Sequence, residues 1–330
     1  MTLVISRSAK LLVTGALAGL LLAGCASGPA QAGSAAIVNG NAISLDSVQA
    51  ELNNYLANQP PASAGQQAAS PADEARTIVG LAVQDQIDNA AVAKYHLNVP
   101  AQAVSEYTQE LGGIPALMKN TGFTSAELQM ILRDRVVQMA YATKYLGQFQ
   151  ITFDLAAVQS QQAATALAQK IAADPANTRS IVSAAAAASQ SQPVLNSTLS
   201  GGSIIGQQTE FEQQAQQSGG SQQAPTILQL FAAKANSVLT FPFTEGQWEV
   251  VVVHKADLTG TASATDKNAL SQISSDDLYQ AGTFLLSPLA QDLSIKISPR
   301  YGVWDQIGMA VVATPGQAGS DVPVKAQLGS

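Results

Sequence analysis

The chain has 330 residues, which is enough for more than one folded unit, and its formal net charge is -7. This acidic balance argues against nucleic acid or an anionic lipid surface as a partner, because both would repel it. Only 12% of the residues are charged and 5% are aromatic, so we expect a mostly aliphatic core.

The first segment is an apolar run from Leu11 to Leu22 that follows two basic residues, Arg7 and Lys10. Basic residues before a short apolar run are typical of a secretory signal. The run is too short to cross a bilayer comfortably as a helix, since a span needs about 20 apolar residues. The sequence therefore predicts an exported protein.

The apolar run ends in Leu22-Ala23-Gly24-Cys25, which resembles a bacterial lipobox, and Cys25 is the only cysteine of the chain. The resemblance implies a lipid on the Cys25 sulfur and cleavage before this residue. We expect residues 1–24 to be a lipoprotein signal peptide and residues 25–34 to be a tether. The protein would then sit on the extracytoplasmic face of the cell membrane, with no disulfide.

Residues 35–150 predict a hairpin followed by helices. Asn39-Gly40 lies between apolar residues and favours a tight hairpin turn, because both turn positions need a positive φ. Ser44, Ser70 and Thr124 are expected N-caps, and Thr124 forms a capping box with Glu127. The predicted helices are Leu45 to Asn58, Pro71 to His96, Ala101 to Leu111, and one that begins at Ser125 and runs through Leu146.

Residues 151–260 alternate strand and helix signals, which predicts a small α/β unit. The expected elements are a strand at Ile151–Leu155, Ala-rich helices at Ala156–Ala173 and Ile181–Ser189, turns at Gly201–Gly206, a mobile stretch at Gln207–Ala224, a helix at Ile227–Ala235 and a buried strand at Trp248–Val253.

The C-terminal part predicts a helical stretch, a short strand and a tail. The helical stretch runs from Thr265 to Gln291 with a break at Ser287-Pro288, since proline interrupts a helix. A strand is expected at Ser294–Ser298. Residues 314–330 are rich in glycine and proline, and we expect them to be disordered.

The residues Ile-Val-Asn-Gly-Asn-Ala-Ile-Ser at 37–44 resemble the start of the SurA/PrsA family of extracytoplasmic chaperones, and residues 44–148 look like the SurA N-terminal domain. Residues 151–256 are similar to a parvulin-type prolyl isomerase domain. The matching points there are Gly201–Gly206, which resembles the family's Gly-Gly-x-Leu-Gly turn, and Phe241–Gly246, which resembles the approach to the last strand. Residues 298–305 look like a motif of related lipoproteins.

The resemblance implies a fold that is mainly α with a smaller α+β part. In this family the C-terminal segment packs back on the N-terminal helices. Residues 35–150 and 261–312 would then form one SurA-like helical body, and residues 151–260 would be an inserted, degenerate parvulin-like α/β domain. Residues 313–330 would be a disordered tail.

The resemblance also implies that the isomerase site has degenerated. Parvulins place one histidine on the first strand of the domain and another on the last. Here the first strand carries Asp154 and no histidine, and the last carries Trp248 and Glu249 at the second position. The expected function is that of an ATP-independent chaperone or foldase for unfolded exported proteins. The alternatives are a prolyl isomerase with an altered site at Asp154 and Trp248, or an envelope assembly subunit with one fixed partner.

Other chemistry finds little support in the sequence. His96 and His254 are far apart and are expected to be partly exposed surface residues, so no metal site is predicted. No cofactor or nucleotide motif is found. Asp134 is expected on a solvated or salt-bridged helix face with its neighbours Arg133 and Arg135.

The surface that binds clients is not defined by the sequence. The expected cradle exposes aliphatic residues such as Leu128, Leu132 and Met139, or their neighbours, along the long helix. Tyr301 and Trp304 are expected to anchor the last segment on the helical body.

Overall fold

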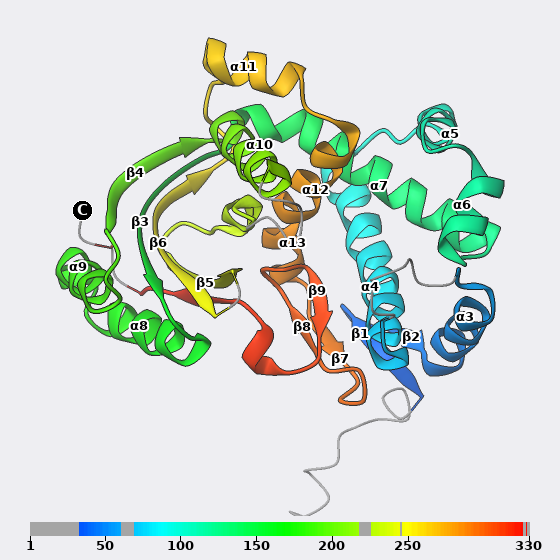
Figure 1. The fold of residues 1–330 in the computed structure, drawn as a ribbon, viewed down its shortest axis with the longest axis horizontal. Coiled ribbons are helices and arrows are strands. Elements are labelled where there is room, and N and C mark those ends of the chain that lie inside the picture. Colours follow the sequence, from blue (N-terminus) through cyan, green and yellow to red (C-terminus); the bar gives the residue numbers. More distant parts are fainter. Residues whose placement is uncertain (1–32, 61–68, 218–225, 245, 326–327, 329–330) are drawn as a thin grey trace, which may run out of the picture.

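The computed structural model describes residues 33–60, 69–217, 226–244, 246–325 and 328. It shows a mixed α+β protein in which helices predominate and the strands form a smaller part (Figure 1). This confirms the coarse part of the predicted fold class. The predicted signal segment, Cys25 and most of the tether lie outside the described residues.

A hairpin and a set of capped helices form the N-terminal body. The elements are β1 (Ser34–Val38), β2 (Asn41–Ser44), α3 (Leu45–Asn58), α4 (Pro71–Tyr95), α5 (Ala101–Glu110), α6 (Ile114–Thr121), α7 (Ser125–Tyr145) and the 3₁₀ turn η1 (Leu146–Gln148). Asn39 and Gly40 both have positive φ, and Ser44, Ser70 and Thr124 cap their helices as predicted. Helix α6 was not predicted.

A five-stranded antiparallel sheet follows, in the strand order β10-β5-β6-β3-β4. Its elements and the helices around it are β3 (Gln150–Val158), α8 (Gln161–Ala173), η2 (Pro175–Asn177), α9 (Thr178–Ala188), β4 (Val194–Ser200), α10 (Gly201–Gln217), η3 (Leu228–Ala232), β5 (Ser237–Thr244) and β6 (Gln247–Asp257). Helices α8 and α9 cover one face of the sheet, and the opposite face is turned toward the helical body (Figure 1).

The C-terminal segment returns to the N-terminal helices. Its elements are α11 (Ala264–Ser271), α12 (Ser275–Leu285), α13 (Ser287–Asp292), β7 (Ile295–Ile297), β8 (Val303–Asp305), β9 (Ala310–Val312), η4 (Pro315–Gln317) and β10 (Ser320–Pro323). Strand β7 pairs with β1, and helix α12 packs along α7. Tyr301 is buried in the apolar core of the helical body, and Trp304 is partly buried against that core. The predicted anchoring role of these two aromatic residues is confirmed.

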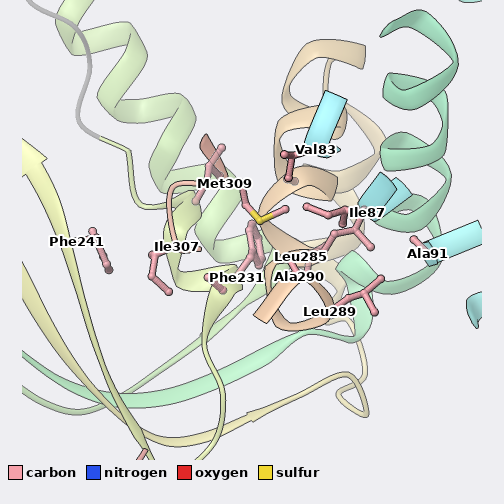
Figure 2. Close-up of a cluster of buried hydrophobic side chains, with 14 of the residues drawn as sticks. Val83, Ile87, Ala91, Phe231, Phe241, Leu285, Leu289, Ala290, Ile307 and Met309 are labelled. Carbon is pink, nitrogen blue, oxygen red and sulfur yellow. The ribbon is translucent and has the colours of Figure 1, made fainter. Parts of the chain in front are cut away.

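One apolar core joins the helical body to the sheet. Ile87 from α4, Phe231 from η3, Leu285 from α12 and Met309 near β9 meet in it, and Phe241 from the sheet belongs to the same cluster (Figure 2). The second face of the sheet has a separate core with α8 and α9. The residues predicted as an inserted unit thus share buried contacts with the body on one side.

The glycine-rich segment at 201–206 forms a helix rather than turns. It opens α10, which continues to Gln217, so residues 207–217 of the stretch expected to be mobile are helical. A Cβ on Gly201 would lie 2.0 Å from the Leu146 carbonyl oxygen, and one on Gly202 would lie 2.6 Å from the Asp266 Cα. These glycines therefore allow close packing of the helix start, a use that sequence reasoning cannot distinguish from a turn.

Part of the C-terminal tail, which was predicted to be disordered, forms a strand. Residues 320–323 form β10, which pairs with β5 through Val322 and Val238, and Val324 and Leu328 are buried. The prediction of a disordered tail is wrong for this part. Glycine and proline indicate loops locally, but they do not exclude edge pairing on a distant strand.

Three element boundaries also differ from the prediction. Residues 156–158 extend β3 instead of starting a helix, because Ala156 and Val158 pair with Val250 and Trp248 on β6. The long C-terminal helix is interrupted at 272–274 as well as at the predicted proline. The segment near Phe231 is a 3₁₀ turn.

Candidate functional site

Asp154 and His254 form a pair between the first and the last strand of the predicted α/β unit. His254 Nε2 lies 3.1 Å from Asp154 Oδ2, and the Asn196 backbone N–H donates to Asp154 Oδ1 at 2.6 Å. The Asp154 side chain is only 2% exposed and the His254 side chain 13%. The histidine is therefore partly exposed, as predicted, and is in addition the partner of Asp154, which was not predicted.

The sheet is irregular at this pair. Strand β3 shifts register against β6 between Thr152 and Phe153, and against β4 between Phe153 and Leu155. Asn196 has a φ of 48°, which is uncommon for a residue other than glycine. Bulges of this kind re-aim side chains and are frequent beside functional sites. His254 Nδ1 is buried and has no hydrogen-bond partner in the described part of the chain.

The other two candidate positions do not join this pair. Trp248 lies on the same face of the sheet but pairs with Val158, whereas Asp154 pairs with Val252. The four-residue offset corresponds to about 13 Å along the strand. Glu249 is paired with Ala157 and Phe241 and points to the opposite face. Asp154 and Trp248, the two predicted site residues, are therefore not brought together by the fold.

Glu249 is nevertheless unusual. It is buried, its Oε2 has no partner among the described residues, and burial in apolar surroundings raises its pKa to about 7. A carboxylate at this place destabilises the fold unless it is protonated.

A cleft lined by aromatic side chains lies where the helical body meets the sheet. It has a volume of about 260 Å³. We call it the aromatic cleft, and its walls include Tyr95, Tyr141, Phe149, Phe231, Ala256 and Leu285. Tyr141, Phe149, Phe231 and Leu285 also belong to the shared core and are at most 4% exposed, so they form the floor of the cleft. The six residues come from α4, α7, the residue between η1 and β3, η3, β6 and α12, so the site exists only when both parts of the chain are assembled.

Ring contacts hold the walls of this cleft. The Tyr95 and Tyr141 ring centroids are 4.9 Å apart, those of Tyr141 and Tyr145 are 4.7 Å apart, and those of Phe149 and Phe231 are 4.9 Å apart. Burial raises the pKa of the Tyr141 hydroxyl above its usual value. The sequence contains only eight phenylalanines and seven tyrosines, so five aromatic residues in one place form a pronounced cluster.

The rim of the aromatic cleft carries lysines. Lys234 lines the cleft and donates to Asp292 at 2.9 Å. Lys94 lies 5.5 Å from the Tyr95 ring centroid, and Lys144 lies 5.1 Å from that of Tyr145 while donating to the Tyr95 carbonyl. Asp257 also lines the cleft, and Lys94 and Lys234 both pair with Asp292, so the apolar interior has a polar rim of mixed charge.

The aliphatic residues predicted to line a cradle are part of a core instead. Leu128 and Leu132 are 3% and 2% exposed and pack with Tyr107 beneath α5 and α6, and Met139 is partly buried against them. Among the described residues, the large apolar side chains that are clearly exposed are Met118, Val194 and Leu195. A broad aliphatic cradle is thus not present on the described surface.

Asp134 is buried near Asp85 and Asp88 and forms an ion pair with Arg133, so of the two predicted environments the salt-bridged one is confirmed and the solvated one is wrong. It accepts from Arg133 Nη1 at 2.9 Å, and burial together with Asp85 raises its pKa to about 7. Asp88 is fully buried, and burial raises its pKa well above the usual value. Gln138 Nε2 donates to Asp88 at 2.8 Å and links it to α12, since Thr283 donates to Gln138.

The remaining predictions concern His96, metal binding and Cys25. His96 is exposed and ends α4 in a left-handed conformation, as expected for a surface histidine. Within the described ranges, no group of three or more acidic, histidine or cysteine side chains could hold a metal ion. Cys25, the predicted lipidation site, lies outside those ranges.

Comparison with models of known protein families and with curated proteins finds no match for this chain. A search of the described helices for one long and apolar enough to cross a membrane also finds none.

Proposed function

We propose that this protein is a lipid-anchored, ATP-independent chaperone or foldase of the SurA/PrsA type that binds unfolded exported polypeptides in the aromatic cleft. The observation that carries the proposal is the cleft itself. It combines an interior of tyrosine, phenylalanine and leucine with a rim that carries Lys234 and Asp257, at the junction of two parts of the chain. Apolar pockets with a few polar groups are the usual form of a binding site.

The size of the cleft indicates what it can hold. A dry apolar cavity of about 150 Å³ is known to accept benzene, so about 260 Å³ is sufficient for one large apolar side chain. Burying such a side chain contributes about 1.5–3 kcal/mol. A dissociation constant of 1 mM already requires about 4 kcal/mol, so a single contact would be weak and short-lived.

Weak binding is adequate for a chaperone if client and protein stay close together. A lipid on Cys25 would hold the cleft beside the membrane from which exported chains emerge, and this raises the effective concentration of client segments. The scarcity of other large exposed apolar side chains on the described surface favours binding of one side chain at a time over binding to a broad surface.

The proposal is tested by aggregation of a reduced, unfolded protein in the presence of the purified full chain. The substitution Ala235→Trp places a large side chain at an exposed position of the cleft wall. The matched control is Ala166→Trp on exposed α8. We expect the wild type and the control to suppress aggregation equally and Ala235→Trp to lose most of the effect. No suppression by the wild type at several-fold excess would contradict the proposal.

A prolyl isomerase with an altered site is the second candidate, because the Asp154–His254 pair occupies an irregular part of the sheet. An isomerase twists an imide bond and needs a shaped pocket with a few hydrogen-bonding groups. The test is an assay on a proline-containing tetrapeptide with Asp154→Asn, His254→Asn and Trp248→Phe made one at a time. Activity that Asp154→Asn and His254→Asn abolish, while both variants stay folded, would favour the enzyme.

A further inference from the structure

A chain of buried hydrogen bonds joins three of the helices that wall the aromatic cleft. Gln138 of α7 donates from Nε2 to Asp88 Oδ2 on α4 at 2.8 Å, and Thr283 of α12 donates to Gln138 Oε1 at 3.1 Å. Asp88 is 0% exposed and Gln138 is 3% exposed. We call these three side chains the helix link, and they tie together helices that are distant in sequence.

The helix link lies close to the cleft on each of its helices. Along α4, Tyr95 follows the link residue by about two turns, and along α7, Tyr141 follows it by about one turn. On α12, Leu285 comes just after the link residue and lines the cleft. A change in the spacing of the three helices at the link therefore changes the cleft.

The packing of α12 on α7 at the link leaves no room for a local adjustment. A Cβ on Gly282 would lie 2.1 Å from the Gln138 carbonyl oxygen, so the two helix backbones are in direct contact. A close-packed interior transmits strain instead of absorbing it. A charge that draws water into the link must therefore move α12 away from α7.

The helix link contains an acid that this packing favours in its neutral form. Asp88 Oδ1 is buried without a hydrogen-bond partner in the described part of the chain, and so is Gln84 Nε2, one turn earlier on α4. Burial, and next the charge of Asp134, raise the pKa of Asp88 well above its usual value. An ionised carboxylate with an unpaired oxygen is costly in such a place.

The charges around Asp88 do not compensate for its ionisation. The strongest influences are Asp134 and Asp85, which oppose a negative charge, and Arg133, which favours one. Arg133 pairs with Asp134 at 2.9 Å and with Asp85 at 3.7 Å. Helix α12 meets the link with the neutral hydroxyl of Thr283, and no charged group of α3, α13, β1 or β9, which also pack on α4, is among these main influences in the described part of the chain.

We infer that the helix link makes binding in the aromatic cleft depend on pH. While Asp88 is neutral, the three helices stay in contact and the cleft keeps its walls. When Asp88 loses its proton, water enters the link, α12 moves away from α7, and the bound side chain loses its contact with Leu285. Proton and client then bind cooperatively, because both favour the same arrangement of the helices. The inference rests on the proposed function for the ligand, an apolar side chain of an unfolded polypeptide.

The test measures the fluorescence anisotropy of a labelled peptide of leucine, phenylalanine, serine and glycine with blocked ends, which has no titratable group. It is added to the full chain at pH 6 and at pH 9, because the pKa of Asp134 is about 7 and its charge delays the ionisation of Asp88. We expect the wild type to bind about tenfold more weakly at pH 9, a loss of about 1.4 kcal/mol. Asp88→Asn cannot ionise and should bind equally at both pH values.

Two further comparisons separate the helix link from a general effect of pH. Thr283→Val removes the hydroxyl that ties α12 to the link and should lose most of the pH dependence, whereas Thr283→Ser keeps the hydroxyl and should retain it. Glu249→Gln is the control, because Glu249 also has a pKa of about 7 but lies seven residues from Ala256 of the cleft, about 23 Å along β6. Circular dichroism establishes that every variant is folded at both pH values.

The wild-type pH dependence in Asp88→Asn, or its loss in Glu249→Gln, would overturn the inference. So would equal binding by the wild type at both pH values.

A second measurement does not depend on any client. Spin labels are attached to the full chain through Ala93→Cys on α4 and Asp276→Cys on α12, two exposed positions, with Cys25→Ser. We expect the distance between the labels to be longer at pH 9 than at pH 6, and to be constant when Asp88→Asn is added. This shift without peptide binding at either pH would contradict the proposed function and leave the pH response of the link standing. A constant distance without Asp88→Asn would overturn the inference, whatever the peptide does.

Discussion

Three buried carboxyl groups make the stability of this protein depend on pH. Asp88, Asp134 and Glu249 lie in the interior, and burial raises the pKa of each above its usual value, to about 7 for Asp134 and Glu249. An acid whose pKa is higher in the folded than in the unfolded state binds protons preferentially when folded. Stability is therefore fully retained below the unfolded pKa near 4 and is lost as pH rises through about 7.

Replacing Glu249 with glutamine tests this account. Burial is the sole cause of its raised pKa, so the neutral amide removes the cost of ionisation without removing an ion pair. We expect Glu249→Gln to be more stable than the wild type at pH 8, by up to about 3 kcal/mol, and nearly equal at pH 5. Thermal unfolding at the two pH values measures the difference. The same change in stability at both would show that ionisation is not involved.

The Asp154–His254 pair predicts a loss of stability when it is broken. Asp154→Ala leaves His254 and the Asn196 N–H without their acceptor in a buried place. We expect a loss of roughly 3–5 kcal/mol in the free energy of unfolding by urea, against a loss of at most about 1 kcal/mol for the exposed control Asp276→Ala, which lies in the first turn of α12. A fully stable Asp154→Ala variant would mean that the pair is not a structural element.

The sequence could suggest Asp154 as a candidate but not its partner. His254 follows four valines on a strand, and a histidine at a strand end is most often a surface residue. Its pairing depends on a register shift between β3 and β6, which has no local signal. The aromatic cleft is a similar case, because Tyr95, Phe149 and Phe231 are separated by long stretches of sequence.

At the scale of elements, close packing of α12 on α7 fixes the C-terminal segment to the helical body. Gly282 permits it, because a Cβ there would lie 2.1 Å from the Gln138 carbonyl oxygen. Backbone against backbone leaves no flexible side chain that could move away. The contact of α12 with α7 is among the most extensive between any two elements described.

Substitution of Gly282 should push α12 away from α7. We expect Gly282→Ala to lower the free energy of unfolding by about 2–3 kcal/mol. Gly206→Ala on α10 is the matched control, since nothing lies within 4 Å of the added Cβ, and alanine favours a helix by about 1 kcal/mol over glycine. Urea midpoints measure both effects. A Gly282→Ala protein that is as stable as the control would contradict the described packing.

The sequence could predict an element's type and its first or last residue wherever the cause lies in a few neighbouring residues. The Asn39-Gly40 turn, the Ser44 and Ser70 caps and the Thr124 capping box act over three or four residues, and the structure bears them out. Strand β10 and the start of α10 could not be predicted, because their conformations depend on Val238 and on Leu146, which are distant in sequence.

At the scale of the whole molecule, the shared core is the main structural finding. Buried residues from the N-terminal helices, from one face of the sheet and from the C-terminal segment pack in a single cluster. Folding units that share buried apolar surface generally unfold together. The part predicted as an inserted domain is therefore not expected to melt on its own.

The two tryptophans can test whether the sheet and the helical body unfold together. Trp248 reports on the sheet and Trp304 on the strands beside the helical body. In Trp248→Phe and in Trp304→Phe, we expect the remaining tryptophan's fluorescence and the far-ultraviolet circular dichroism to give the same urea midpoint. Two separated transitions in either variant would mean that the sheet and the body fold independently.

Photo-crosslinking from the wall of the aromatic cleft tests the proposed function most directly. A photoreactive amino acid is placed at position 235, or at position 166 on α8 as a control, and the full chain is mixed with an unfolded or a folded client. The account predicts capture of the unfolded client from position 235 only. Equal capture from both positions, or equal capture of the folded client, would contradict it.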